Sequence, residues 1–109
     1  MTWEINYLPE ACEDLAELDG GTRILVLKAI KKTQTNPLPA NEGGYEKPLG
    51  NKGNRNLTGL LKIKLKSSGI RIIYKLLRQE DKMLIFVIGI REDEKVYDAA
   101  ERRIEKHNL

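Results

Sequence analysis

Residues 60–78 read LLKIKLKSSGIRIIYKLLR and contain two strand patterns separated by a tight turn. In the first half, leucine and isoleucine alternate with Lys62, Lys64 and Lys66, a period of two that predicts a strand with one apolar face. The tripeptide Ser67-Ser68-Gly69 predicts a hairpin connection. The β-branched run that follows predicts a second strand, so we expect an antiparallel hairpin at the centre of the fold.

Patterns on either side of this hairpin extend the prediction toward both ends of the chain. Upstream, residues 3–8 alternate as a strand, and helices are predicted to begin near Pro9 and Thr22. Downstream, the apolar residues 82–90 predict a central strand, and the residues from about 93 predict a terminal helix. The order β-α-α-β-β-β-α predicts an α+β fold, in which a small antiparallel sheet packs on an N-terminal helical hairpin.

Two further expectations concern packing. The apolar positions Ile24, Leu27 and Ile30 are expected to face the core from the second helix. Residues 36–56 are rich in Gly, Pro and Asn, so we expect them to form a long irregular connection that Leu49 anchors to the core.

The composition of the 109 residues is typical of one globular domain spanning residues 1–109. The longest apolar run, residues 83–88, is far shorter than the roughly 20 residues of a membrane span, so we expect no membrane partner. The N-terminus lacks the pattern of a secretory signal. The single cysteine, Cys12, is expected to be buried by packing, and its lack of a disulfide partner fits a cytoplasmic protein.

Positive charge is concentrated in the middle of the sequence. Residues 45–78 hold nine basic and one acidic side chain, whereas residues 1–44 hold four and seven, and residues 79–109 hold six and eight. The middle third therefore has a net charge of +8, while the whole chain has +3. Such a concentration favours binding of polyanions, and a solvated lysine face is the alternative explanation.

The alternation of residues 60–66 predicts where this charge lies. If the apolar side chains face the helices, Lys62 and Lys64 face the opposite, open side of the sheet. Arg71 follows the hairpin turn on the adjoining strand, and Arg91 comes at the end of the third strand of the meander. We therefore expect these four cations to share one surface.

The residue types narrow the chemistry that this surface could perform. The only histidine, His107, cannot form a histidine pair for acid–base catalysis or a histidine-rich metal site. The glycines of residues 43–53 lack the following Lys-Ser/Thr of a phosphate-binding P-loop. Carboxylates lie mainly on predicted helices and turns, away from the basic strands. We therefore expect no metal and no cofactor, which leaves lysine, arginine and tyrosine as candidate functional side chains.

The run LKIKLKSSGIRIIY at residues 61–74 resembles the signature of the RelE/ParE superfamily of bacterial toxins. The similarity continues through VIGIRE at residues 87–92 and EKVY at residues 94–97. It is greatest to the RelE branch, whose members are ribosome-dependent mRNA endonucleases of type II toxin–antitoxin systems. The N-terminal strand and the following Pro9-Glu10-Ala11 are also family-like, and the insert within residues 36–56 is the clearest departure.

The resemblance implies a catalytic set of Lys62, Lys64, Arg71, Arg91 and Tyr97. It implies metal-independent attack of an mRNA ribose 2′-OH on the adjacent phosphate, which leaves a cyclic phosphate and a free 5′-OH. Neighbouring cations favour the neutral form of Lys64, our candidate general base. Arg71 would hold the scissile phosphate, Arg91 would protonate or stabilise the departing oxygen, and Tyr97 would stack on a base or orient the 2′-OH.

The resemblance also implies partners, namely a cognate antitoxin protein, mRNA on the ribosome, and a higher-order toxin–antitoxin complex. Two alternative functions remain on the same fold: a ParE-like inhibitor of DNA gyrase, and an RNA-binding module without catalysis. Retention of all five positions of the catalytic set favours the nuclease over the gyrase inhibitor.

Overall fold

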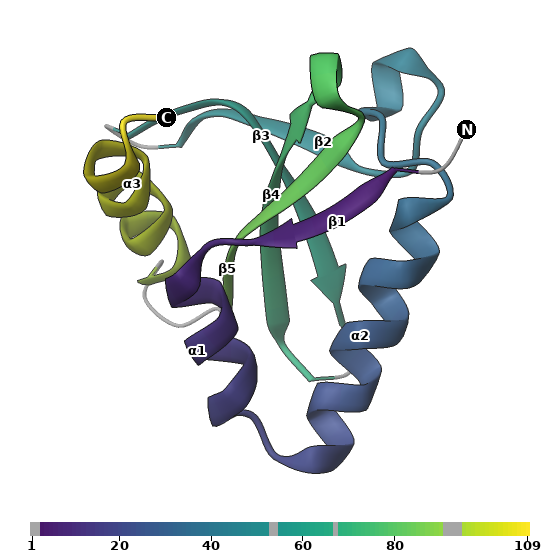
Figure 1. Cartoon of the computed structure of the whole chain (residues 1–109), viewed down its shortest axis with the longest axis vertical. Coiled ribbons are helices and arrows are strands. Elements are labelled where there is room, and N and C mark those ends of the chain that lie inside the picture. The colour runs from purple at the N-terminus through teal and green to yellow at the C-terminus, as the bar shows by residue number, and fades with distance from the viewer. Residues whose placement is uncertain (1–2, 53–54, 67, 91–94) are drawn as a thin grey trace.

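The computed structural model describes residues 3–52, 55–66, 68–90 and 95–109. In this part of the chain, five strands form one sheet in the order β1-β5-β4-β3-β2, and three α-helices pack against it (Figure 1). The predicted α+β fold is confirmed. The elements are β1 (Glu4–Tyr7), α1 (Pro9–Glu17), α2 (Gly20–Gln34), β2 (Lys47–Lys52), β3 (Arg55–Leu65), β4 (Ile70–Leu77), β5 (Lys82–Ile90) and α3 (Lys95–His107), with two short 3₁₀ helices, η1 (Ala40–Glu42) and η2 (Arg78–Glu80).

The sheet is mixed, whereas the sequence predicted a wholly antiparallel one. The β3–β4 and β4–β5 pairs are antiparallel, as expected for strands joined by short turns. β1 instead pairs in parallel with β5, with Ile5 opposite Met83. Because helices α1 and α2 carry the chain away from β1, this strand reaches the sheet edge without a hairpin that would impose antiparallel pairing.

The segment predicted to be irregular, residues 36–56, contains a strand. β2 pairs with β3, which begins at Arg55 and is longer than expected, and Lys47 lies opposite Lys62. The segment is also anchored to the core: Leu49 is partly buried against it, as expected, and the Tyr74 hydroxyl donates a hydrogen bond to the Pro37 carbonyl at 2.8 Å. The prediction of a structureless connection was therefore wrong, although its anchor was identified.

The face that helix α2 presents to the core agrees only in part with the prediction, because Ile30 is buried as expected but the other two predicted positions are not. Val26, Ile30 and Thr33 are buried, whereas Ile24 and Leu27 are 54% and 41% exposed. Residues 24–27 are all apolar, so spacing alone did not select the buried face.

The start of α2 also differs by a few residues from the prediction. Asp19, and not Thr22, is the N-cap, and its carboxylate accepts a hydrogen bond from the Thr22 backbone N–H at 2.8 Å. Cys12 on α1 is exposed and not buried as expected, because the core-facing position of this turn is taken by Ala11.

The helices lie on both faces of the sheet. α1 packs on β5 and α2 on β3, while α3 packs across β3, β4 and β5 (Figure 1). Lys62 contacts a side chain of α3, so α3 covers part of the face that we expected to be open. Within the described residues, no helix is both long and apolar enough to cross a membrane.

Candidate nucleic-acid interface

Four lysines line a cleft beside the edge of β3, which we call the lysine groove. Its walls enclose about 470 Å³ and are formed by Tyr45, Glu46, Lys47, Lys62, Lys64 and Lys66. Burial raises the pKa of the Glu46 carboxyl, and Lys32 of α2 partly offsets this effect. One carboxyl faces four lysines in this cleft, so the groove carries an excess of positive charge even with Glu46 ionised.

Lys62 and Tyr97, two members of the predicted catalytic set, are in contact. The Lys62 ammonium donates a hydrogen bond to the Tyr97 hydroxyl at 3.4 Å and lies 6.0 Å from the centroid of the ring. Tyr97 itself has no exposed surface. In this conformation its ring is not accessible for stacking, whereas its hydroxyl is held beside a lysine of the groove.

Arg71 lies next to Lys64 but is buried behind the groove. Its Cα is paired with that of Lys64 on β3 and with that of Gly89 on β5, so the three residues share one face of the sheet. The side chain is only 8% exposed, and its Nη1 donates a long hydrogen bond of 3.3 Å to the Ile70 carbonyl. Its Nε has no hydrogen-bond partner among the described residues. A buried guanidinium with an unsatisfied donor is energetically costly, and binding an anion would lower that cost.

Arg91, the fifth member of the predicted set, lies outside the described residues. The other four members lie together where β3 and β4 meet helix α3. Lys62 and Lys64 reach the groove, while Arg71 and Tyr97 are buried beside it. Of the four cations predicted to share one surface, Lys62 and Lys64 line the groove and Arg71 is buried on the same face of the sheet, while the placement of Arg91 stays a prediction.

Contacts between two helices hold α3 in this place, and we call them the α1–α3 clamp. It consists of two acidic residues of α1, Glu10 and Asp14, and three basic residues of α3, Arg103, Lys106 and His107. The Asp14 carboxylate accepts a hydrogen bond from Arg103 Nη1 at 2.7 Å. Glu10 contacts Lys106 Nζ at 3.0 Å and His107 Nε2 at 2.9 Å. The hydrogen bond from Lys106 is the largest of the effects that lower the pKa of Glu10 from 4.5 to about 2.

The clamp also supplies hydrogen-bond partners to backbone groups at the edge of β5, beyond the point where its pairing with β1 ends. Pairing of β1 with β5 extends only to Ile85. Further along β5, the Ile88 N–H donates to Asp14 at 3.1 Å, and the Phe86 carbonyl accepts from Arg103 Nη1 at 2.7 Å. The same ion pair therefore joins α1, α3 and the sheet.

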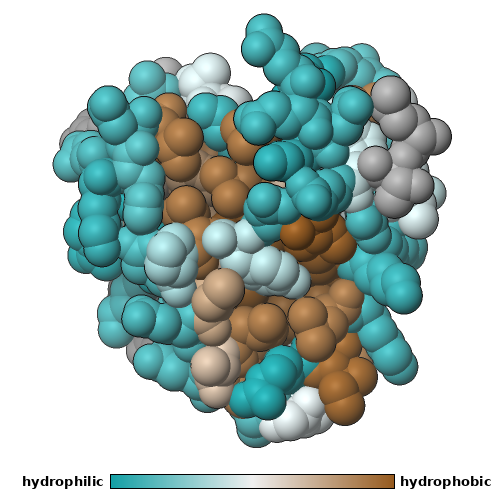
Figure 2. Space-filling view, viewed as in Figure 1, coloured by the Kyte–Doolittle hydropathy of each residue, from teal (hydrophilic) through white to brown (hydrophobic). Residues whose placement is uncertain are grey.

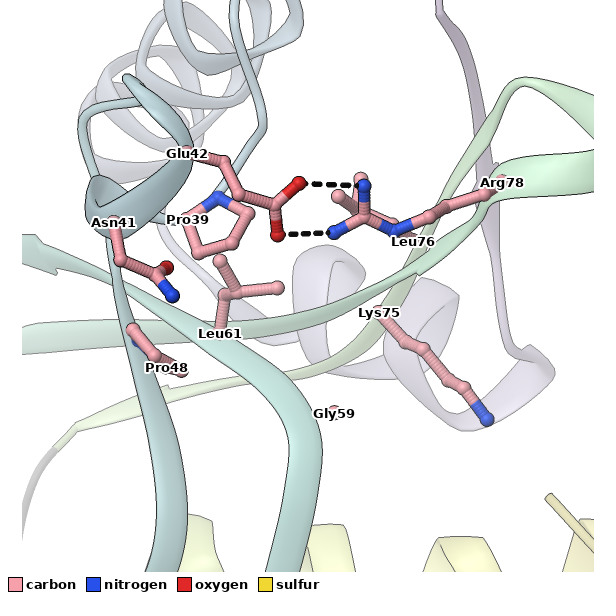
Figure 3. Close-up of a pocket in the computed structure, with 9 residues that line it drawn as sticks. All are labelled: Pro39, Asn41, Glu42, Pro48, Gly59, Leu61, Lys75, Leu76 and Arg78. Carbon is pink, nitrogen blue, oxygen red and sulfur yellow. Dashed lines mark hydrogen bonds and ion pairs between the residues drawn. The ribbon is translucent and has the colours of Figure 1, made fainter.

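A second cleft lies on another part of the molecule and differs in character. It encloses about 320 Å³ between η1, the β2–β3 hairpin and the end of β4 (Figure 3). Across it, Glu42 accepts two hydrogen bonds from the Arg78 guanidinium at 2.8 and 2.7 Å. Because this arginine is already paired with a carboxylate, the cleft offers less to an anion than the lysine groove does.

An apolar surface lies on α2, away from the groove. Ile24, Leu25 and Leu27 are 54%, 49% and 41% exposed. Figure 2 shows apolar side chains gathered over part of α2 and between α2 and α1. Such a contiguous surface is typical of a protein-binding site.

The sequence predictions missed the contribution of the residues before and within β2. Tyr45 and Lys47 line the lysine groove, but both lie in the segment predicted to be irregular. The charge of Lys47 was part of the basic middle third, and that charge was the available signal for this residue, whereas Tyr45 carried none. Within the part of the chain that the structure describes, no three Asp, Glu, His or Cys side chains gather as a metal site would require.

Comparisons with known proteins give a consistent result, although no family model matches the chain. A putative RelE-like toxin protein of Escherichia coli is 25% identical over 105 residues, which cover 95% of this chain and 99% of the relative. A mutant of the E. coli toxin RelE in the free state has a TM-score of 0.71 at 24% identity and covers 95% of this chain and 99% of its own. The toxin–antitoxin complex RelBE2 from Mycobacterium tuberculosis contains a chain with a TM-score of 0.66 at 20% identity, covering 84% of this chain and 100% of its own.

The curated relative and the solved structures match nearly their full lengths, so the similarity includes the strands and helices that build the lysine groove. The resemblance carried by residues 61–74 and 87–97 is thus confirmed by two independent comparisons. The chain is similar in sequence to a putative RelE-like toxin, and it shares the fold of the solved RelE toxins.

Proposed function

We propose that the chain is the toxin of a type II toxin–antitoxin system and that it cleaves mRNA on the ribosome. The observation that carries this proposal is the environment of Arg71. Arg71 is buried, its Nε lacks a partner among the described residues, and it is paired across the strands with Lys64, which lines the lysine groove. A phosphate of an RNA backbone would satisfy the unpaired donor and the surrounding positive charge together.

The proposed reaction is a transesterification that requires no metal. Lys64, exposed at the groove, removes the proton of a ribose 2′-OH, whose oxygen then bonds to the adjacent phosphorus. The bond from phosphorus to the 5′ oxygen breaks, leaving a 2′,3′-cyclic phosphate, and the departing oxygen takes up a proton. Arg71 and Lys62 stabilise the extra negative charge of the transition state.

The two remaining residues of the set act on the attacking 2′-OH and on the departing 5′ oxygen. Tyr97 is fully buried with its hydroxyl beside Lys62, which supports a role in orienting the 2′-OH through that lysine and not in stacking. Arg91 protonates or stabilises the departing 5′ oxygen, as the resemblance implies.

A cognate antitoxin is the proposed protein partner, and the cytoplasm is the proposed location. Solved relatives include the toxin–antitoxin complex RelBE2, which supports a partner of this kind. Ile24, Leu25 and Leu27 on α2 are exposed and apolar, and the exposed Lys28 and Lys31 on the same helix favour an acidic amphipathic segment as their cover. We also propose that the two proteins assemble into a higher-order complex.

The test is cleavage of mRNA by the purified protein, with and without ribosomes and in the presence of EDTA. The expected products carry 2′,3′-cyclic phosphate and 5′-OH ends. Lys64→Ala and Arg71→Ala should lower the cleavage rate by about 10²-fold or more while the protein stays folded, because each removes transition-state stabilisation. Lys28→Ala, which removes an exposed lysine of α2, is the matched control and should retain activity.

Two outcomes would redirect the assignment. Intact mRNA together with inhibited DNA supercoiling would indicate a gyrase inhibitor, whereas RNA binding without any cleavage would indicate a non-catalytic module. Active Lys64→Ala and Arg71→Ala variants would contradict the proposed site even if the wild-type protein cleaves mRNA.

A further inference from the structure

Recognition of single-stranded RNA commonly uses an exposed aromatic ring on which an unpaired base can stack. All six aromatic residues of the chain lie within the described ranges. Tyr74, Phe86 and Tyr97 have no exposed surface, and Trp3 and Tyr7 are partly buried. Tyr45, at 59% exposure, is the aromatic side chain that offers an accessible ring face.

Tyr45 lies at the lysine groove and not on a remote surface. It lines the cleft together with Lys47, Lys62, Lys64 and Lys66. It also borders a neighbouring cleft of about 220 Å³, formed by residues of α2 and by Ile63 and Leu65 of β3. The ring therefore stands between a strongly positive cleft and a less polar one.

The backbone that carries Tyr45 is fixed in position. The Ala40 N–H donates to the Glu46 carbonyl at 2.7 Å, and the Gly44 N–H donates to the Pro39 carbonyl at 3.1 Å. A Cβ atom at Gly44 would lie only 1.6 Å from the Leu38 carbonyl oxygen, so the chain passes too close at this point for any side chain. A ring on a preorganised segment loses little conformational entropy when it binds a ligand.

We propose that Tyr45 is a base-stacking subsite of the lysine groove for single-stranded RNA. This inference rests on the proposed function, because it identifies how the same groove would hold its RNA substrate. The lysines attract the phosphates without regard to sequence, and Tyr45 stacks on one unpaired base of the same strand. The subsite thus takes over the stacking that the buried Tyr97 cannot perform in this conformation.

The experiment compares two polyanions, one with bases and one without. The probes are a short single-stranded oligoribonucleotide with 2′-O-methyl groups, which 2′-OH attack cannot cleave, and inorganic polyphosphate. Tyr45→Ala should weaken RNA binding roughly 5- to 100-fold and leave polyphosphate binding unchanged, whereas Tyr45→Phe should bind both like the wild type. Lys47→Ala should weaken binding of both probes. It should also lower by about one the number of counterions released on binding, as read from the salt dependence of the affinity.

Gln79→Ala, at an exposed uncharged position of η2, is the matched control and should bind both probes normally. Wild-type RNA affinity in Tyr45→Ala would overturn the subsite while leaving the proposed function intact. Equal losses for RNA and polyphosphate in Tyr45→Ala would also overturn it, because they would show a change in groove shape and not a loss of stacking. A wild-type protein that binds polyphosphate but not the oligoribonucleotide would overturn the subsite, and it would overturn the proposed function as well if mRNA on ribosomes also stays intact.

Discussion

Substitution of Asp14 tests whether the α1–α3 clamp holds the candidate site together. In the native protein, the Asp14 carboxylate accepts hydrogen bonds from Arg103 Nη1 at 2.7 Å, Arg103 Nη2 at 3.3 Å and the Ile88 N–H at 3.1 Å. Asp14→Ala removes all three and leaves Arg103, among the described residues, with the hydrogen bond to the Phe86 carbonyl. We expect α3 to detach from the sheet more readily, and Tyr97 to separate from Lys62.

The expected loss of stability follows from the burial of the pair. Removing one partner of a fully buried ion pair costs about 3–5 kcal/mol, and an exposed pair contributes about 1 kcal/mol or less. The side chains of Arg103 and Asp14 are 16% and 19% exposed, so water can replace part of the lost interaction. We therefore expect Asp14→Ala to lower the free energy of unfolding by about 3 kcal/mol.

The assay is urea denaturation combined with native-state hydrogen exchange. The amides of α3 should exchange faster in Asp14→Ala, while those of β4 and β5 should keep more of their protection. Glu13→Ala is the matched control, since Glu13 is an exposed neighbour on the same helix and should change stability by less than about 0.5 kcal/mol. In a double-mutant cycle, Asp14→Ala and Arg103→Ala should show a coupling energy of about 1–3 kcal/mol. A coupling near zero, or a loss no larger than that of Glu13→Ala, would refute the role assigned to the clamp.

Two further predictions concern contacts that β5 and α1 make with α3. A Cβ atom at Gly89 would lie 3.0 Å from Val96 Cγ1, so Gly89→Ala should lower the free energy of unfolding in urea by about 1 kcal/mol, and the added Val96→Ala should recover part of it. A loss that Val96→Ala does not relieve would contradict this packing. The pKa of Glu10 is lowered from 4.5 to about 2, chiefly by its hydrogen bond with Lys106 and also by His107, so Glu10 contributes stability above pH 4.5 and loses that contribution as the pH falls toward 2. The difference in unfolding free energy between the wild type and Glu10→Gln should shrink over this pH range, and a difference independent of pH would exclude the charged contact.

Sequence periodicity predicted most of the sheet because the strands have clear apolar and polar faces. The alternation around Lys62 and Lys64 placed both lysines on the correct side of β3, and the apolar run of β5 gave its bounds. β2 was missed because its sequence, KPLGNK, contains Pro and Gly and has no alternation. Its strand structure comes from pairing with β3, which is a tertiary interaction that no local pattern records.

The sequence could predict which residues contribute to the candidate site, but not how these residues are arranged in space. Strand parity showed that Lys62, Lys64 and Arg71 share a face, since parity depends only on backbone alternation. It could not show that α3 returns to cover part of that face and buries Tyr97, because this depends on ion pairs between residues 89 or more positions apart in the sequence. Tyr45 was not identified either, because its place at the groove depends on the pairing of the adjacent β2 with β3, which no local pattern records.

The two helices of the clamp lie far apart in the sequence, and this distance affects the order in which the parts of the protein fold. Contacts between residues distant in sequence form late, because much chain entropy must be lost before they are made. During synthesis, α1 and α2 emerge directly after β1 and before the other four strands, and α3 follows every strand of the sheet. The apolar surface of α2 is therefore complete before Tyr97 reaches Lys62. The antitoxin proposed above, if it binds α2, would therefore meet the growing chain before Lys62 and Tyr97 of the proposed catalytic set are in contact.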